Sequence, residues 1–199
     1  MVKAILLDLD GLVIRPRHKY FSEKLSEDYK IPLSEIMPFF KNEYKLAAKG
    51  EVGIREVLPL YLKKWGWKKS LDDFLTYWFE SEKTPDTNIL EISKKLREKG
   101  LKVYLVSNNE KERANYVMKD LGLKNLFDGG YFSCNLGFTK SEPEFFQKIL
   151  EDLKFKSGEI MHWDDDPKEV DAAKSVGINA KLYTSFENFK DSLSFFPKL

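Results

Sequence analysis

The amino-acid sequence predicts an α/β fold whose core is a doubly wound, Rossmann-like parallel sheet. Short unbroken apolar runs occur at residues 4–7, 103–106 and 160–163, and such runs are typical of strands buried on both faces of a parallel sheet. Amphipathic helical patterns lie between the runs, and each run leads directly into polar residues. Strands that alternate with helices of this length imply right-handed crossovers between parallel strands.

The individual elements follow from apolar periodicity and from residues that begin or end helices. Two weaker strand candidates lie at residues 131–134 and 180–183. Apolar residues share one helical face in four segments, at residues 89–96, 114–121, 145–153 and 167–176. Gly100, Gly122 and Gly177 are placed to end three of these helices. Asp166 followed by Pro167 is a favourable start for the fourth.

The stretch between the first strand and the rest of the sheet interrupts this alternation. It contains helical patterns at residues 25–30, 36–48, 54–64 and 71–79, and no convincing strand. We therefore expect an α/β core domain made of residues 1–14 and 84–199. A helical cap subdomain of residues 15–83 is inserted after the first strand.

Composition excludes several classes of protein. The chain has 199 residues with 33 basic and 32 acidic side chains, a net charge of +1 that argues against nucleic-acid and membrane partners. A single cysteine excludes an internal disulfide framework and a thiolate-rich metal site. Every apolar run is far shorter than the roughly 20 residues of a membrane span. Asp8 interrupts the first apolar run too early for a signal peptide, so we expect a cytoplasmic protein.

Acidic and polar residues follow three of the predicted strands, where ligands bind in open α/β sheets. They are Asp8 and Asp10, Ser107 and Asn108, and Asp164 and Asp165. Four carboxylates in one crevice would repel one another and raise each other's pKa values. A hard cation relieves this repulsion, and ligands that are all oxygen favour Mg²⁺. Mg²⁺ with open water positions is a usual arrangement for handling phosphate.

The same residue types can support phosphoryl transfer. An aspartate beside Mg²⁺ can attack phosphorus and form an aspartyl-phosphate. A second carboxylate two residues later can protonate the leaving oxygen and then activate water. A serine hydroxyl, a backbone N–H and a lysine ammonium can stabilise the charge that develops on the phosphoryl oxygens.

Four segments, in this order, resemble the motifs of the haloacid dehalogenase-like (HAD) superfamily. The segments are DLDG at residues 8–11, VSN at 106–108, KSEPEFF at 140–146 and WDDDPKEV at 163–170. The resemblance implies that Asp8 is the nucleophile and Asp10 the general acid and base. Ser107 and the backbone amide of Asn108 would bind the phosphoryl group, and Lys140 would bridge the nucleophile and the phosphate.

The resemblance also implies a Mg²⁺ site and a substrate-selecting cap. The ligands would be the Asp8 carboxylate, the Asp10 backbone carbonyl and Asp165, while Asp164 would orient a metal water or Lys140. Which of Asp164 and Asp165 contacts the metal is left open. The stretch from residue 15 to residue 83 matches the position of the family's helical cap, which closes over the crevice.

The resulting prediction is a Mg²⁺-dependent phosphatase that hydrolyses a small phosphorylated metabolite. The layout most resembles family members that act on sugar phosphates. A phosphosugar mutase is an alternative, because it uses the same nucleophile and acid. A haloacid dehalogenase is disfavoured by the presence of Asp10, and a non-catalytic phospho-acceptor by the order of the motifs. We expect a monomer, since the predicted aspartates need no partner subunit.

Overall fold

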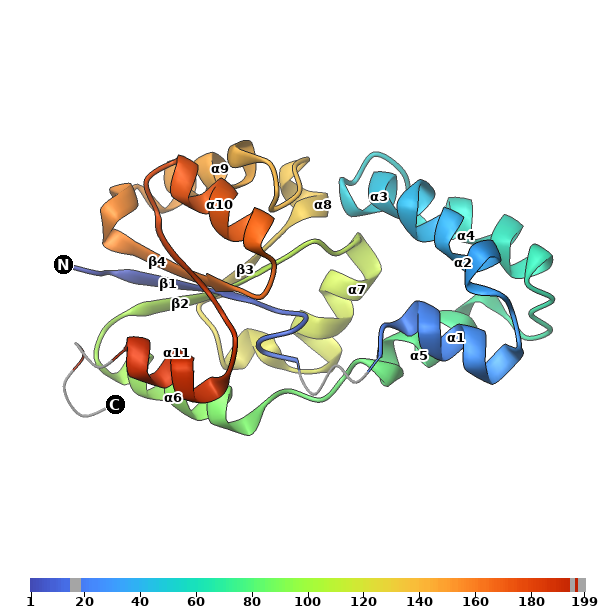
Figure 1. Ribbon diagram of the computed structural model, residues 1–199, viewed down its shortest axis with the longest axis horizontal. Coiled ribbons are helices and arrows are strands. Elements are labelled where there is room, and N and C mark those ends of the chain that lie inside the picture. Colours follow the sequence, from blue (N-terminus) through green and yellow to red (C-terminus); the bar gives the residue numbers. More distant parts are fainter. Residues whose placement is uncertain (15–18, 194–195, 197–199) are drawn as a thin grey trace.

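The computed structural model describes residues 1–14, 19–193 and 196. Within these residues the core is a five-stranded sheet in the order β3-β2-β1-β4-β5, with every neighbouring pair parallel. The strands are β1 (Ala4–Asp8), β2 (Lys102–Ser107), β3 (Gly129–Phe132), β4 (Ile160–Asp164) and β5 (Asn179–Leu182). The sheet and its flanking helices confirm the predicted α/β fold (Figure 1).

Helices cover both faces of the sheet. Ile5 and Leu7 of β1 belong to the hydrophobic cluster under α6 (Thr87–Glu98), α7 (Lys111–Asn115) and α11 (Phe186–Ser192). Ala4 and Leu6 face the other way, toward α9 (Pro143–Leu153) and α10 (Pro167–Ser175). All five residues of β1 are buried, which explains why this strand has no polar alternation. Figure 1 shows α9 and α10 on one side of the sheet, and α6 and α11 on the other.

Strand β3 begins two residues before the predicted segment at 131–134. Gly129 and Gly130 pair with Tyr104 and Leu105 of β2, and the chain turns into a short helix α8 (Ser133–Leu136) directly after Phe132. A Cβ atom on Gly130 would lie 2.7 Å from the ring of Phe132, so a larger residue here would have to displace that buried ring. A strand that starts with two glycines lacks the side chains on which strand predictions depend.

The polar ends of two core helices explain where they begin. The Asp86 carboxylate accepts a hydrogen bond from the Asn88 N–H at 2.9 Å and caps α6. The Asp166 carboxylate accepts from the Lys168 N–H at 2.8 Å, and Pro167 is the first residue of α10, as the sequence predicts. Helix α7 continues into a π-helical turn at Tyr116–Asp120, and single 3₁₀ turns lie at Leu123–Asn125 and Ser157–Glu159.

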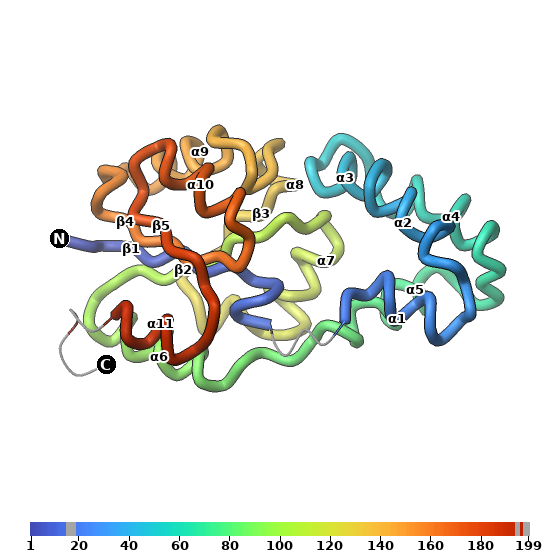
Figure 2. Tube along the Cα trace, in the orientation of Figure 1, coloured from blue at the N-terminus to red at the C-terminus, as the bar shows by residue number. Residues whose placement is uncertain are grey.

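Between β1 and α6, the described residues form five helices beside the sheet, and we call them the cap helices. They are α1 (Phe21–Tyr29), α2 (Leu33–Lys41), α3 (Glu43–Ala48), α4 (Ile54–Lys64) and α5 (Leu71–Ser81). They enclose their own hydrophobic cluster, rich in aromatic rings. Figure 2 shows them apart from the sheet, with the chain returning from α5 to α6.

The cap helices α1 and α2 begin at Phe21 and Leu33, a few residues before the predicted segments, and the largest difference lies at Asn42. The predicted helix at residues 36–48 is two helices, because Asn42 has φ −118° and ψ −85° and turns the chain between α2 and α3.

The division into a core domain and a cap subdomain at residues 15–83 stays a prediction, and residues 15–18 lie outside the described part of the chain. Among the described residues, no helix has the length and apolar character that crossing a bilayer requires.

Candidate active site

The carboxyl ends of the central strands meet at one cavity. Asp8 is the last residue of β1, Ser107 the last of β2 and Asp164 the last of β4, and β1 lies between the other two strands. A cavity of about 740 Å³ opens at these strand ends, and residues of the cap helices line its other side. Every sequence-predicted site residue except Asp164 lines this cavity; these are Asp8, Asp10, Ser107, Asn108, Lys140 and Asp165.

Lys140 lies at the centre of an acidic cluster. Its ammonium group bonds to Oδ1 of Asp8, and it lies 2.8 Å from Oδ2 of Asp164 and 2.6 Å from Oε2 of Glu169. The Lys140 side chain is only 4% exposed, and the Asp8 and Asp164 side chains 3% and 0%. Three carboxylates around one buried ammonium stabilise its charge.

Burial and this ammonium set the protonation of the cluster. Burial raises the pKa of the Asp8 carboxyl well above its usual range, and Lys140 offsets this only in part. Burial opposes the charge on Asp164 as well, but Lys140 and His162 together hold the pKa of that carboxyl below its usual value. Burial raises the pKa of Glu169 to about 7. The carboxylates raise the pKa of Lys140 well above its usual value although burial opposes them.

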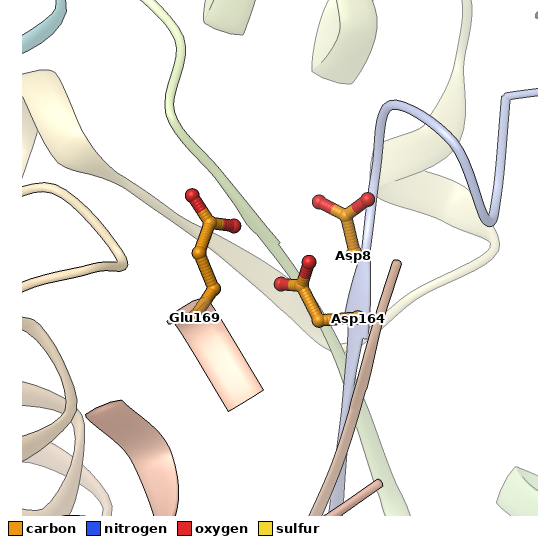
Figure 3. A group of neighbouring side chains, drawn as sticks. All are labelled: Asp8, Asp164 and Glu169. Atoms are coloured by element: carbon orange, nitrogen blue, oxygen red, sulfur yellow. The ribbon is translucent and has the colours of Figure 1, made fainter. Parts of the chain in front are cut away.

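Asp8, Asp164 and Glu169 form one acidic group, and their carboxylates point into the same region (Figure 3). One oxygen from each lies within 4.8 Å of the others, which is close enough to share a metal ion. The Lys140 ammonium already bonds to all three, however, and would repel a second cation there. Asp10 and Asp165 line the same cavity as Asp8 and Glu169, and they offer carboxylates for a cation outside this Lys140-centred group.

Asp165 packs tightly against the loop after β1. Gly11 in this loop has φ +126°, and a Cβ atom on it would lie 2.2 Å from Oδ2 of Asp165. The missing side chain thus lets the Asp10–Gly11 backbone approach the Asp165 carboxylate. Asp165 therefore lies beside Gly11, the residue that follows the predicted metal ligand Asp10, and both acids line the cavity.

Side-chain amides and hydroxyls connect the site's loops. Oδ1 of Asn108 accepts a hydrogen bond from the Lys140 N–H at 2.7 Å, and its Nδ2 donates to Oε1 of Glu169 at 2.6 Å. The Ser107 hydroxyl donates to Oδ2 of Asp10 at 3.3 Å. The loops after β2 and before α9 are therefore tied to the acidic cluster.

Three polar residues of this region were not among the predicted site residues: Glu169, Asn109 and Arg113. Asn109 donates to Oδ2 of Asp10, and Arg113 donates to Oδ1 of the same carboxylate. Glu169 lies three residues after the helix cap Asp166, where a glutamate normally completes a capping box. Glu169 lies within the fourth motif, and Asn109 directly follows the second motif at a polar strand end, which were the available signals for these two residues. Nothing in the sequence pointed to Arg113.

The sheet order and the acidic strand ends define a doubly wound α/β protein with its ligand site at the carboxyl ends of the central strands. Residues 2–177 match the family model of the haloacid dehalogenase-like hydrolases, and the chain belongs to this family of enzymes. The match covers the cap helices and all strands of the core except β5. This agrees with the resemblance of the four sequence motifs.

Curated relatives match nearly the whole chain. An alignment of 199 positions with a phosphorylated carbohydrates phosphatase of Thermotoga maritima is 25% identical and covers 96% of this chain and 88% of the relative. An alignment of 202 positions with an enolase-phosphatase E1 of a Sulfurihydrogenibium species is 26% identical and covers 90% of this chain and 86% of the relative.

Solved structures share the fold. A HAD family enzyme of Bacteroides thetaiotaomicron superposes with a TM-score of 0.83 at 22% identity, over 96% of this chain and 98% of that chain. The same bacterial enzyme has been crystallised with magnesium and inorganic phosphate, and that complex superposes with a TM-score of 0.77 at 22% identity, over 96% and 99%. At 22% sequence identity, these superpositions show that the folds are alike and no more than that.

Proposed function

We propose that the protein is a Mg²⁺-dependent phosphatase that hydrolyses the monoester of a small phosphorylated metabolite. The observation that supports this most directly is the Lys140 ammonium, which joins Asp8 and Asp164 at the ends of β1 and β4. A cation beside a buried aspartate at the floor of a cavity suits an anionic substrate that this aspartate attacks.

The cavity offers a donor set that fits magnesium. Asp8, Asp165 and the backbone carbonyl of Asp10 supply only oxygen ligands, the type that Mg²⁺ prefers. Burial raises the pKa of Asp8, so a cation beside it would favour the ionised form that a nucleophile needs. When bound, Mg²⁺ would neutralise charge on the transferring phosphoryl group. The relative crystallised with magnesium and phosphate supports this choice of metal.

The chain's own residues would act in two steps. In the first, a carboxylate oxygen of Asp8 attacks phosphorus, the bond to the leaving oxygen breaks, and Asp10 gives that oxygen a proton. In the second, Asp10 takes a proton from water while the water oxygen attacks phosphorus and the bond to Asp8 breaks. Ser107, the Asn108 N–H and Lys140 would hold the phosphoryl oxygens throughout.

The substrate we propose is a sugar phosphate or a metabolite of similar size. The cavity of about 740 Å³ falls within the range of small-molecule sites. The Thermotoga relative is named for phosphorylated carbohydrates. The cap helices would enclose the leaving group and exclude water during the reaction. We also propose that the protein is cytoplasmic, and that it acts as a monomer because the predicted catalytic aspartates need no partner subunit.

Release of inorganic phosphate from p-nitrophenyl phosphate by wild type and Asp8→Asn tests the proposal. We expect turnover by the wild type and its loss in the variant, with unchanged circular dichroism. Wild-type rates from the variant would refute the nucleophile assignment. A panel of phosphorylated metabolites then identifies the substrate class. A best substrate that is isomerised without phosphate release would favour the phosphosugar mutase instead.

A further inference from the structure

The Asp10 carboxylate is held at both of its oxygens by residues that also contact the cap. Nη2 of Arg113 donates to Oδ1 at 3.4 Å, and Nδ2 of Asn109 donates to Oδ2 at 2.6 Å. Neither residue belongs to the four motifs, and both come from the segment after β2. The two contacts fix the carboxylate's direction, because each engages a different oxygen.

Arg113 connects Asp10 to the end of the last cap helix. Its Nη1 donates to the backbone carbonyl of Phe79 at 3.2 Å, and its Nη2 donates to that of Glu82. Phe79 belongs to α5, and Glu82 follows its last residue, where the chain returns to the core. The guanidinium is also 5.6 Å from the ring centres of both Phe79 and Tyr116. With a side chain only 3% exposed, it has little freedom to move apart from these partners.

Asn109 makes a second connection to the cap. Its Oδ1 accepts a hydrogen bond from the Tyr44 hydroxyl of α3 at 3.2 Å, while its Nδ2 also bonds to the Ser107 hydroxyl at 2.6 Å. Tyr44 lines the cavity from the cap side. One amide thus links a cap helix, the second motif and the proposed general acid.

We propose that Arg113 and Asn109 are positioning residues that hold Asp10 for proton transfer only when the cap helices are seated on the core. The inference rests on the proposed function, in which Asp10 protonates the leaving oxygen. A displaced cap would move Tyr44 and the α5 carbonyls, and both links to the carboxylate would change with it. The geometry therefore couples enclosure of the substrate by the cap helices to the orientation of the Asp10 carboxylate.

The test compares leaving groups, because only a poor leaving group needs the proton. kcat/KM is measured for p-nitrophenyl phosphate and for glucose 6-phosphate, or for the best alkyl monophosphate of the metabolite panel if glucose 6-phosphate is not hydrolysed. Well-placed general acids contribute about 10²–10⁴-fold. We expect Arg113→Ala to lower kcat/KM for the alkyl ester about 100-fold and for the aryl ester less than about 10-fold. Arg113→Lys should recover part of the alkyl activity.

Tyr44→Phe keeps the test informative if Arg113→Ala fails to fold. It removes only the hydroxyl that bonds to Asn109. We therefore expect kcat/KM for the alkyl ester to fall about 3- to 10-fold, which is less than the effect of losing the general acid itself. Tyr61→Phe is the matched control, because the Tyr61 hydroxyl bonds to Glu43 within the cap at 2.6 Å. This control should leave both kcat/KM values unchanged.

The outcomes separate the inference from the function beneath it. Asp10→Asn is the reference variant: without the general acid, kcat/KM should fall more for the alkyl ester than for the aryl ester. If Asp10→Asn shows that dependence, while folded Arg113→Ala and Tyr44→Phe lose activity equally on both esters or not at all, the positioning role is overturned. Full phosphate release by Asp8→Asn would instead overturn the proposed function.

Discussion

The Lys140 ammonium lies 2.8 Å from the Asp164 carboxylate, and the same ammonium bonds to Asp8, which is 132 positions away in the chain. This buried contact joins the loop before α9 to two neighbouring strands of the sheet. It stabilises the arrangement of the site as well as its charge, because removing one partner leaves buried charges uncompensated.

Replacing Lys140 should therefore reduce both activity and stability. We expect Lys140→Met to abolish phosphate release and to lower the free energy of unfolding by about 3–5 kcal/mol. Urea unfolding at neutral pH measures the change. Lys148→Met is the control, since Lys148 pairs with Glu151 at 2.9 Å with its side chain 48% exposed. Its change should stay within about 0.5 kcal/mol. Equal stability of both variants would contradict a structural role for the Lys140 cluster.

Removal of magnesium should stop turnover. We expect a chelator to abolish phosphate release and added Mg²⁺ to restore it. Ca²⁺ should fail to restore it, because Ca²⁺ prefers more ligands and longer, looser coordination than this small set of oxygens provides. Full activity in excess chelator would rule out the metal requirement.

Gly11 offers a test of the contact between the first motif and Asp165. Gly11→Ala would place a Cβ 2.2 Å from the Asp165 carboxylate, at φ +126°. We expect a loss of about 1–3 kcal/mol in unfolding free energy and a higher Mg²⁺ concentration for half-maximal activity. Gly158→Ala is the control, because a Cβ there meets no atom within 4 Å. An unchanged Mg²⁺ titration in Gly11→Ala would show that the contact does not influence metal binding.

Asp128 links stability to pH at the far end of the sheet. Burial favours its neutral form, but hydrogen bonding by the Val103 N–H and the cations of Lys102 and Arg97 hold the pKa of Asp128 below its usual value of 3.8. The ionised form therefore stabilises the fold above pH 3.8, and this contribution is lost as the pH falls through the lower folded value. We expect Asp128→Asn to cost about 1 kcal/mol at pH 7.

The cost of Asp128→Asn should shrink as the pH falls below 3.8. Urea unfolding of wild type and variant at pH 7 and at pH 3 measures the difference at each pH. A cost of the same size at both pH values would mean that the charge on Asp128 contributes nothing.

The sequence predicted strands best where both faces of the strand are buried. The apolar runs at residues 4–7, 103–106 and 160–163 became the three central strands. β3 was displaced because Gly129 and Gly130 pair through their backbone alone. The break at Asn42 depends on how α2 and α3 pack, and no local periodicity reports it.

The candidate site could be anticipated only in part. Acids at strand ends converge in any parallel sheet, so the meeting of Asp8 and Asp165 at one cavity was predictable. Arg113 lies on a short helix in the charged stretch Glu110–Arg113. From the sequence alone, such a run of charges is expected on the solvent-exposed surface. Its burial comes from partners in α5 and the first motif, far away in the sequence. Contacts of this kind become visible only when the tertiary structure is known.

The position of β1 has a consequence for how the enzyme acquires activity. Its hydrogen-bonding neighbours are β2 and β4, so Ala4 pairs with Lys102 on one side and with Ile160 on the other. A chain emerging from the ribosome exposes one edge of its first strand until most of the polypeptide has been made. Closing such long loops is slow compared with forming local helices. Recovery of turnover during refolding should thus coincide with insertion of β4, later than the gain of helical signal.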